Sequence, residues 1–389
     1  MSATPVYLDY NATTPVDLRV AKLMMRIFEA EVGNAGSTSH DYGLRAKRHV
    51  EHARRQVAQV VAARRHEVIF TSGATEANNL ALLGLAAHGE QTRRRHIVST
   101  QIEHKSVLEP LAELARRGFD VTLVPPTRGG WVEAAAIADV LRHDTLLVSV
   151  MHANNETGIL QPIEEITDVL DERDVYFHVD AAQGFGKDLL PLRRGRIDLI
   201  SVSGHKIFGP QGIGALIARR RGQLLPPLKP LLFGGGQEFG VRPGTLPVAL
   251  IAGFGLAAEL ATKEADQRRQ KCVAFRERLL SALKRLQPVI NGDEHRALPH
   301  VVNLSFPGID ADQAIEALSP IVAASDGAAC TSICSSASHV LSAMQLPAEY
   351  VDGGIRMSWG HLTGDPNWHA LRAIPLNKLP SVQQMSQSI

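Results

Sequence analysis

The chain has 389 residues, of which 44% are hydrophobic and 21% are charged, and its 41 lysines and arginines nearly balance its 40 aspartates and glutamates, for a net charge of +1. This length fits two or three domains, and this composition excludes a largely disordered chain and argues against a protein dominated by affinity for nucleic acid. The three cysteines are too few for a disulfide scaffold and favour a reducing compartment.

Neither a membrane span nor a signal peptide is expected. The sequence holds no apolar run of the length that crossing a membrane requires, and the residues after Met1 lack the basic and apolar regions of a secretory signal. We therefore expect a cytoplasmic protein without a membrane partner.

Short apolar runs alternate with segments of helical period through the first part of the chain. The strand candidates are Glu67–Thr71, His96–Ser99, Asp120–Val124, Leu146–Met151, Tyr176–Val179, Leu199–Val202 and Gly214–Ile217. The helix candidates are Leu44–Ala63, Ala77–Leu85, Val107–Arg117, Val132–Arg142 and Ile163–Leu170. This alternation predicts an α/β fold with a mostly parallel sheet and helices on both of its faces.

The pattern changes after about residue 250. Ala252–Lys284 has the period of one long helix or a helix pair, and after it come a strand candidate, His300–Phe306, a helix candidate, Ala311–Ser319, and the segment Ile321–Ala324. This α+β pattern predicts a second, smaller domain that starts near residue 255.

Four turns place reactive residues where a predicted strand ends, which is where open α/β sheets bind ligands. The first turn runs from Thr71 to Glu76 (TSGATE) and leads into a helix. Its small residues leave backbone N–H groups free, so it fits a phosphate, with the Thr75 hydroxyl as a further donor. A capped helix without a ligand is the alternative.

The second and third turns carry an aspartate and a lysine. Asp180 follows a buried strand and needs a partner, which is either a salt bridge or the protonated nitrogen of a heterocycle. Lys206 follows the next strand in a glycine-rich turn, where desolvation would favour the neutral, nucleophilic amine that a Schiff-base lysine requires. A surface lysine is the alternative at this position.

The fourth turn surrounds Cys330 with small residues, in the sequence DGAACTSIC that ends at Cys334. An accessible cysteine in a reducing compartment is a candidate nucleophile. The two cysteines alone are weak evidence for a metal site, because no second pair lies nearby, and we predict no metal.

Together these turns predict one cofactor. Pyridoxal phosphate needs a phosphate cradle, an aspartate on its ring nitrogen and a Schiff-base lysine, and Thr75, Asp180 and Lys206 supply the three in chain order. His104, after the strand His96–Ser99, could stack on the ring and move protons, or it could only cap the following helix.

Long motifs in a fixed order extend this prediction from Val6 to about residue 364: YLDYNATTPVD, VGNAGSTSH, IFTSGATEANNLAL, EHKSVLEPL, MHANNETG, HVDAAQGFGK, SVSGHKIFGPQGIGAL, GGGQEFGVRPGTLP, GAACTS and IRMSWG. In these motifs the sequence closely resembles the cysteine desulfurases, within the class-V aminotransferase group of fold-type I pyridoxal-phosphate enzymes. The ACTS form of the cysteine motif is similar to group I of that family.

The resemblance implies the fold and domains of a fold-type I transferase. Residues 14–255 are expected to form a large cofactor-binding domain with a mostly parallel seven-stranded sheet. Residues 1–13 and 256–389 are expected to form a smaller α+β domain that carries the catalytic cysteine loop.

The resemblance also implies roles for the matching residues. Those that hold the cofactor are Ala74, Thr75, His104, Asn155, Asp180, Gln183, Ser203, His205, Lys206 and, from the other subunit of an obligate homodimer, Thr245. Lys206 carries the cofactor and later serves as acid and base, while Gln183 binds the ring oxygen. Arg356, whose planar fork suits a carboxylate, binds the substrate with Asn155 and Asn34.

The implied reaction removes sulfur from L-cysteine, releases L-alanine and leaves a persulfide on Cys330. An acceptor protein then takes the sulfur, in iron–sulfur assembly, tRNA thiolation or DNA phosphorothioation. The phrases LALLGLAAHGEQTRRRHIVS and SHVLSAMQLP are similar to desulfurases linked to DNA phosphorothioation. Cys334 departs from the pattern and could protect or resolve the persulfide or be a bystander. In housekeeping desulfurases a C-terminal extension helps dock a scaffold protein, and from the resemblance we expect this extension to be shortened here, with its last helix interrupted by Pro375.

Other functions stay open at this point. A selenocysteine lyase or an aminotransferase would use the same cofactor, and an aminotransferase would not need Cys330. The basic runs at 93–95, 219–221 and 44–65 motivate direct binding to nucleic acid, although such runs are usually solvated faces and the net charge argues against it. A scaffold that has lost catalysis conflicts with the intact lysine, aspartate and cysteine.

Overall fold

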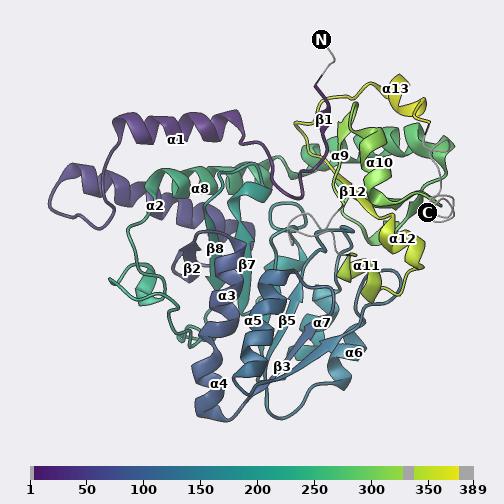
Figure 1. Ribbon diagram of the computed structural model, residues 1–389. Helices are drawn as coiled ribbons and strands as arrows, with labels where there is room; N and C mark the ends of the chain where they lie inside the picture. Colours follow the sequence, from purple (N-terminus) through teal and green to yellow (C-terminus); the bar gives the residue numbers. More distant parts are fainter. Residues whose placement is uncertain (1–3, 327–336, 376–389) are drawn as a thin grey trace.

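A seven-stranded sheet lies at the centre of the larger part of the protein (Figure 1), in a computed structural model that describes residues 4–326 and 337–375. The strands follow the order β2-β8-β7-β6-β5-β3-β4. Their bounds are β2 (Val68–Thr71), β3 (His96–Thr100), β4 (Asp120–Val124), β5 (Thr145–Met151), β6 (Tyr176–Asp180), β7 (Leu199–Ser203) and β8 (Gly214–Ala218). Within this sheet β8 runs antiparallel to both neighbours and the other pairings are parallel. The predicted mostly parallel sheet is therefore confirmed.

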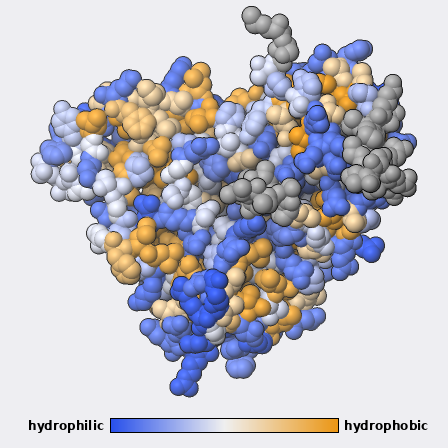
Figure 2. All heavy atoms as spheres, viewed as in Figure 1, coloured by the Kyte–Doolittle hydropathy of each residue, from blue (hydrophilic) through white to orange (hydrophobic). Residues whose placement is uncertain are grey.

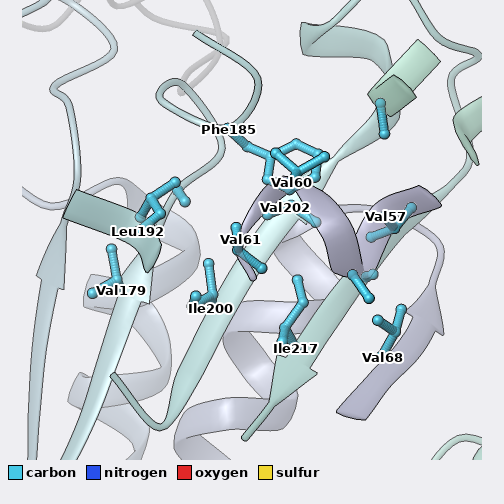
Figure 3. Close-up of a cluster of buried hydrophobic side chains, with 14 of the residues drawn as sticks. Val57, Val60, Val61, Val68, Val179, Phe185, Leu192, Ile200, Val202 and Ile217 are labelled. Carbon is cyan, nitrogen blue, oxygen red and sulfur yellow. The ribbon is translucent and has the colours of Figure 1, made fainter. Parts of the chain in front are cut away.

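Helices cover both faces of this sheet. The helices on one face are α2 (Asp41–Val60), α6 (Ala134–Asp139), α7 (Ile163–Leu170) and α8 (Val248–Lys263), and those on the other are α3 (Ala74–Gly84), α4 (Ala86–Thr92) and α5 (Lys105–Arg116). Alternate residues of a strand face opposite layers, so Phe70 packs with the first group and Ile69 with the second. Figure 3 shows part of the first layer, where Val57 and Val60 of α2 and the following Val61 lie against side chains of the sheet, Val68 of β2 and Ile217 of β8 among them.

One helix, α1 (Leu18–Ala30), is absent from the sequence-based prediction. Asp17 caps it by accepting a hydrogen bond from the backbone N–H of Arg19, and Val20 and Ile27 are buried where the helix packs on α8. Its opposite face exposes several apolar side chains, Leu18, Met25 and Phe28 among them. The sequence does carry a signal for this helix, because Arg19, Lys22, Arg26 and Glu29 recur at helical spacing and form a polar stripe beside the buried residues.

The smaller part of the molecule has its own core, which includes Leu8, Phe275 and Trp359. Its strands are β1 (Val6–Tyr7), β9 (Val289–Ile290), β10 (Val301–Ser305), β11 (Val322–Ala323) and β12 (Ile355–Ser358). Its helices are α9 (Ala265–Leu283), α10 (Ala311–Leu318), α11 (His339–Ala343), α12 (Ala348–Asp352) and α13 (Trp368–Arg372). β1 pairs with β11, so the start of the chain joins its C-terminal part. This separate core supports the predicted division, whose boundaries stay predictions.

The segment predicted as one long helix or a helix pair is a pair, because α8 and α9 meet at Glu264. None of the helices that the structure describes combines the length and the apolar character needed to cross a membrane.

Candidate active site

A cavity of about 480 Å³ opens where β6 and β7 end. Asp180 is the last residue of β6 and Ser203 the last of β7, and the carboxyl ends of parallel strands meet at one edge of the sheet. The predicted site residues that line this cavity are Ala74, Thr75, His104, Asn155, Asp180, Gln183, Ser203, His205, Lys206 and Arg356.

The N-terminus of α3 forms one wall of the cavity. No side chain caps this helix, since its N-cap residue is Gly73. The backbone at Gly73 lies so close to β8 that a Cβ on Gly214 would meet the Cα of Gly73 at 2.7 Å. The first N–H groups of a helix have no partner within it, and hydroxyl groups of Thr75 and Ser203 stand beside them. This set of donors, at the positive end of a helix, suits a phosphate.

Asp180 is held by amide groups. The carboxylate is 5% exposed and accepts hydrogen bonds from Nδ2 of Asn78 at 2.7 Å and from the backbone N–H of Ala182 at 3.0 Å. Within the described residues Asp180 forms no salt bridge, so of its two predicted partners the protonated nitrogen of a heterocycle is the one that the geometry favours. A buried carboxylate that faces a cavity is suited to pair with a cationic ring nitrogen.

Lys206 extends from a short 3-10 turn, Gly204–Lys206, that directly follows β7. Its ammonium donates hydrogen bonds to the backbone carbonyls of Asn11 and Ala12, the latter at 2.8 Å. The lysine is therefore directed to the cavity and is not the surface lysine of the alternative prediction.

His104 both caps α5 and lines the cavity, so its two predicted placements are compatible. Its Nδ1 accepts a hydrogen bond from the backbone N–H of Ser106 at 3.0 Å and lies 2.7 Å from the Ser106 hydroxyl. Burial lowers the pKa of His104, against the opposite effect of Asp180. The ring is therefore neutral near pH 7, and because Nδ1 is an acceptor, Nε2 is the atom that carries the proton.

Arg356, on β12, brings a buried guanidinium to the cavity. The residue is 1% exposed, its Nη2 lies 2.6 Å from Oδ1 of Asp9, and its Nη1 donates to the carbonyl of Asn155 at 3.1 Å. Its Nε is buried and has no partner among the described residues. A buried donor without an acceptor costs free energy, and a carboxylate ligand would supply that acceptor.

Some predicted residues lie elsewhere. Asn34 is exposed, accepts a hydrogen bond from the backbone of Gly36 and does not line the cavity. Thr245 is also exposed and away from it, and Cys330 and Cys334 lie outside the described residues. Sequence analysis missed the lining residues Asn11 and Ser106 and the buried Asn78. For Asn78 a signal existed, because it follows Thr75 by three residues and so shares a helix face with it.

Cys272 lies outside the cavity, and it is buried in the core of the smaller part. Burial raises the pKa of its thiol to about 11, so it is not a reactive thiolate. Across the described residues, no group of three or more histidine, cysteine, aspartate and glutamate side chains is arranged to hold a metal ion.

The basic run at 219–221 has a structural role. Arg219 is buried and donates hydrogen bonds to the carbonyls of Val61 and Leu192, and Arg221 pairs with Asp198 at 2.6 Å. These guanidinium groups are already engaged with backbone carbonyls and a carboxylate of this chain. The run at 219–221 therefore gives little support to direct binding of nucleic acid.

Comparison with known proteins adds to this geometry. The family model for aminotransferase class-V matches residues 6–364. The cysteine desulfurase IscS of Pectobacterium carotovorum subsp. carotovorum (strain PC1) is 42% identical over 362 residues, which cover 92% of this chain and 89% of that protein. Among solved structures, DndA from Streptomyces lividans is 48% identical with a TM-score of 0.80, covering 92% of this chain and 100% of that one. A NifS-like protein is 34% identical with a TM-score of 0.86, over 99% of this chain and 100% of that one.

Proposed function

The chain belongs to the class-V aminotransferase family and is one of its cysteine desulfurases, and from this premise we propose how its residues carry out the reaction. The sulfur of L-cysteine moves to the thiol of Cys330: an S–S bond forms, the Cβ–S bond breaks, and a proton replaces the sulfur on Cβ to give L-alanine. The observation that carries this proposal is that Lys206, Asp180 and Arg356 converge on one cavity.

Cysteine desulfurases of this family use pyridoxal phosphate, and we propose that this cavity holds it. The donors around α3 and β7 fit its phosphate: Ala74, Thr75, Ser203 and His205. Asp180 fits the ring nitrogen and Lys206 fits the aldehyde. When bound, the cofactor supplies an electron sink for the carbanion formed at the substrate Cα.

The proton that leaves the substrate Cα is taken up by residues of this cavity. The amine of Lys206 is suited to this role, because an amine can accept a proton and later return it. His104 offers a second group, whose proton sits on Nε2 because Nδ1 is occupied by Ser106. Burial lowers the pKa of His205 to about 4, with the charge of Lys206 adding to the effect, so this ring approaches the phosphate as a neutral donor.

Arg356 orients the substrate through its carboxylate. Asp9 and the carbonyl of Asn155 hold two of its nitrogens, which leaves the guanidinium little freedom to turn. A fixed, planar donor defines the position of the carboxylate and, through it, the direction of the Cα–H bond.

A homodimer is the proposed assembly. In the loop between β8 and α8, Phe233 is 92% exposed and Leu232 is 55% exposed, and in α1 Phe28 is 57% exposed. Figure 2 shows hydrophobic atoms gathered over α1 and over this loop. Apolar groups in water favour burial, and a second copy of the chain would supply it. Thr245, from the same loop, is the residue proposed to reach the partner's phosphate.

The acceptor of the sulfur is proposed to be a protein, and the cytoplasm is the proposed location. The similarity to DndA supports the predicted subgroup linked to DNA phosphorothioation. Iron–sulfur assembly and tRNA thiolation stay as the other predicted destinations. For Cys334 the two predicted roles are protection or resolution of the persulfide, and a bystander.

The test compares the wild type with Cys330→Ser and Cys272→Ser, each incubated with L-cysteine and assayed for alanine and for protein-bound persulfide. The wild type and Cys272→Ser should form both products, and Cys330→Ser should form neither at a comparable rate. Equal activity in the wild type and in Cys330→Ser would overturn the role of Cys330. Formation of a keto acid would indicate an aminotransferase, and turnover of selenocysteine alone would indicate a selenocysteine lyase.

A further inference from the structure

A second group of titratable side chains borders the active site and has no part in the function proposed above. Lys187, His300 and Cys272 line a separate cavity of about 60 Å³. This volume holds no more than a few water molecules, so the group is not a binding site for a metabolite. Its place beside the active site suggests that it acts on the residues of that site.

Lys187 connects this group to Gln183. Its Nζ lies 3.1 Å from Nε2 of His300 and 3.4 Å from Oε1 of Gln183. The residue as a whole is partly exposed, but its ammonium group is enclosed. Gln183 in turn donates from Nε2 to the carbonyl of Asn11 at 2.9 Å, and the same carbonyl accepts a hydrogen bond from Lys206. One chain of hydrogen bonds thus runs from His300 to Lys206.

We propose that Lys187, held by His300, is a positioning residue that fixes the side-chain amide of Gln183 with its NH2 group toward the active site. The inference deepens the proposed function and rests on it, because Gln183 is there the residue that binds the ring oxygen of the cofactor. An amide has a donor end and an acceptor end that differ little in shape, so its orientation depends on its partners.

The two neighbours of Gln183 permit one orientation. As it stands, Oε1 accepts from Lys187 and Nε2 donates to the carbonyl of Asn11. The reverse orientation would set the NH2 group against the ammonium of Lys187 and Oε1 against the carbonyl oxygen of Asn11. One contact would then place two hydrogen-bond donors together, and the other would place two acceptors together. The second hydrogen on Nε2 stays available for the ring oxygen of the cofactor.

His300 keeps Lys187 in place by accepting a hydrogen bond. Burial lowers the pKa of His300 well below its ordinary value, and the charge of Lys187 adds to this effect. The neutral ring offers Nε2 as an acceptor for Lys187, which it could not do as a cation. His300 also anchors its segment to the smaller part of the molecule, because its carbonyl accepts from the backbone N–H of Trp359 at 2.9 Å.

The charge on Lys187 reaches the cofactor through the amide. A cation at Oε1 polarises Gln183, which strengthens the donor at Nε2 and so stabilises negative charge on a ring oxygen. Burial, followed by the charge of Lys206, lowers the pKa of Lys187 to about 7, and Cys272 acts in the opposite direction. The remaining charged and titratable groups around the same cavity are Tyr10, Arg268, Arg269, His300 and His361. Lys187 is therefore charged below about pH 7, where its positive charge favours loss of a proton from the bound cofactor, so removal of the side chain should raise the pH at which the cofactor's visible absorption changes.

The experiment uses the holoenzyme of the wild type, Lys187→Met, Lys187→Arg and the matched control Lys271→Met, which removes an exposed lysine from α9. It measures the dissociation constant of pyridoxal phosphate and the midpoint of the pH-dependent change in its visible absorption. Lys187→Met should weaken binding by about tenfold and raise the midpoint by about half a pH unit, while Lys187→Arg should restore part of both. Lys271→Met should match the wild type in both.

A second pair of variants tests the role of His300 while keeping Lys187. His300→Leu should show the defects of Lys187→Met in smaller form, and His300→Gln, which keeps an acceptor, should show less. Wild-type values in Lys187→Met, or equal defects in Lys187→Met and Lys187→Arg, would overturn the inference. Failure of the wild type itself to take up the cofactor would instead overturn the proposed function, so the two failures are distinguishable.

Discussion

Asn78 donates a hydrogen bond from Nδ2 to Oδ2 of Asp180 at 2.7 Å, and this contact joins the helix of the proposed phosphate cradle to the carboxylate at the end of β6. The same Nδ2 donates to the Ser106 hydroxyl at 2.9 Å, which lies 2.7 Å from Nδ1 of His104. One fully buried side chain thus links Asp180 and His104 to α3.

Loss of this link should loosen the carboxylate that is proposed to hold the cofactor. Asn78→Ala removes a donor to a charged group, so we expect the dissociation constant of pyridoxal phosphate to rise by about tenfold. An absorbance titration with added cofactor measures it. Asn79→Ala is the matched control, because Asn79 is the next residue on α3, its side chain donates to the Thr75 carbonyl, and it does not line the cavity. Equal affinities in the two variants would contradict the role of Asn78.

Arg356→Lys should separate substrate binding from cofactor binding. Lysine keeps the charge but cannot hold both Asp9 and the Asn155 carbonyl while it also forms a two-point contact with a carboxylate. We expect kcat/KM for L-cysteine to fall by about tenfold to a hundredfold, with an unchanged affinity for the cofactor. Steady-state kinetics and the same absorbance titration measure the two quantities. Arg278→Lys, at an exposed ion pair with Asp365, is the control, and a loss of cofactor in Arg356→Lys would count against the assignment.

The parts of this structure that the sequence predicts are those whose cause is local. Most strands of the large sheet are rich in apolar residues because both of their faces are covered, and Asp180 and Lys206 stand out because each lies at the end of such a strand. Asn78 was missed although it shares a helix face with Thr75, because the sequence does not show that this face turns toward Asp180. Contacts between distant segments cannot be predicted from the spacing of residues in the sequence. Asp9 and Arg356 are 347 residues apart, and Lys187 and His300 are 113 residues apart.

His178 should make the stability of the fold depend on pH. It is fully buried between the hydroxyls of Ser149 and Ser201, and burial lowers its pKa from 6.5 to about 4. The unfolded chain therefore binds a proton between these values that the folded chain does not, so stability falls as the pH falls through this window. At pH 5 the loss from this group is about 2 kcal/mol.

Chemical denaturation at pH 7.5 and pH 5 tests this effect. His178→Gln should be less stable at pH 7.5 but should lose about 2 kcal/mol less than the wild type on going to pH 5. The exposed His143→Gln is the control and should keep the wild-type difference. Glu264 does not interfere, because its hydrogen bond to Arg19 lowers its pKa to about 2 and its contribution is lost only in more acidic solution. An unchanged pH dependence in His178→Gln would refute the assignment.

Phe233→Asp tests the proposed homodimer. Phe233 is 92% exposed in the single chain, and each dimer that buries it would do so twice, because a two-fold axis repeats every contact. Burial of a phenylalanine is worth about 2 kcal/mol, so a charge at this position should weaken the dimer by at least about a hundredfold. Sedimentation over a range of concentrations measures the dissociation constant. Leu190→Asp, at a side chain that is 71% exposed in another loop, should leave the dimer intact. Because Thr245 is proposed to complete the partner's phosphate site, the monomer of Phe233→Asp should also bind pyridoxal phosphate more weakly, and a stable dimer in this variant would show that the loop is not the interface.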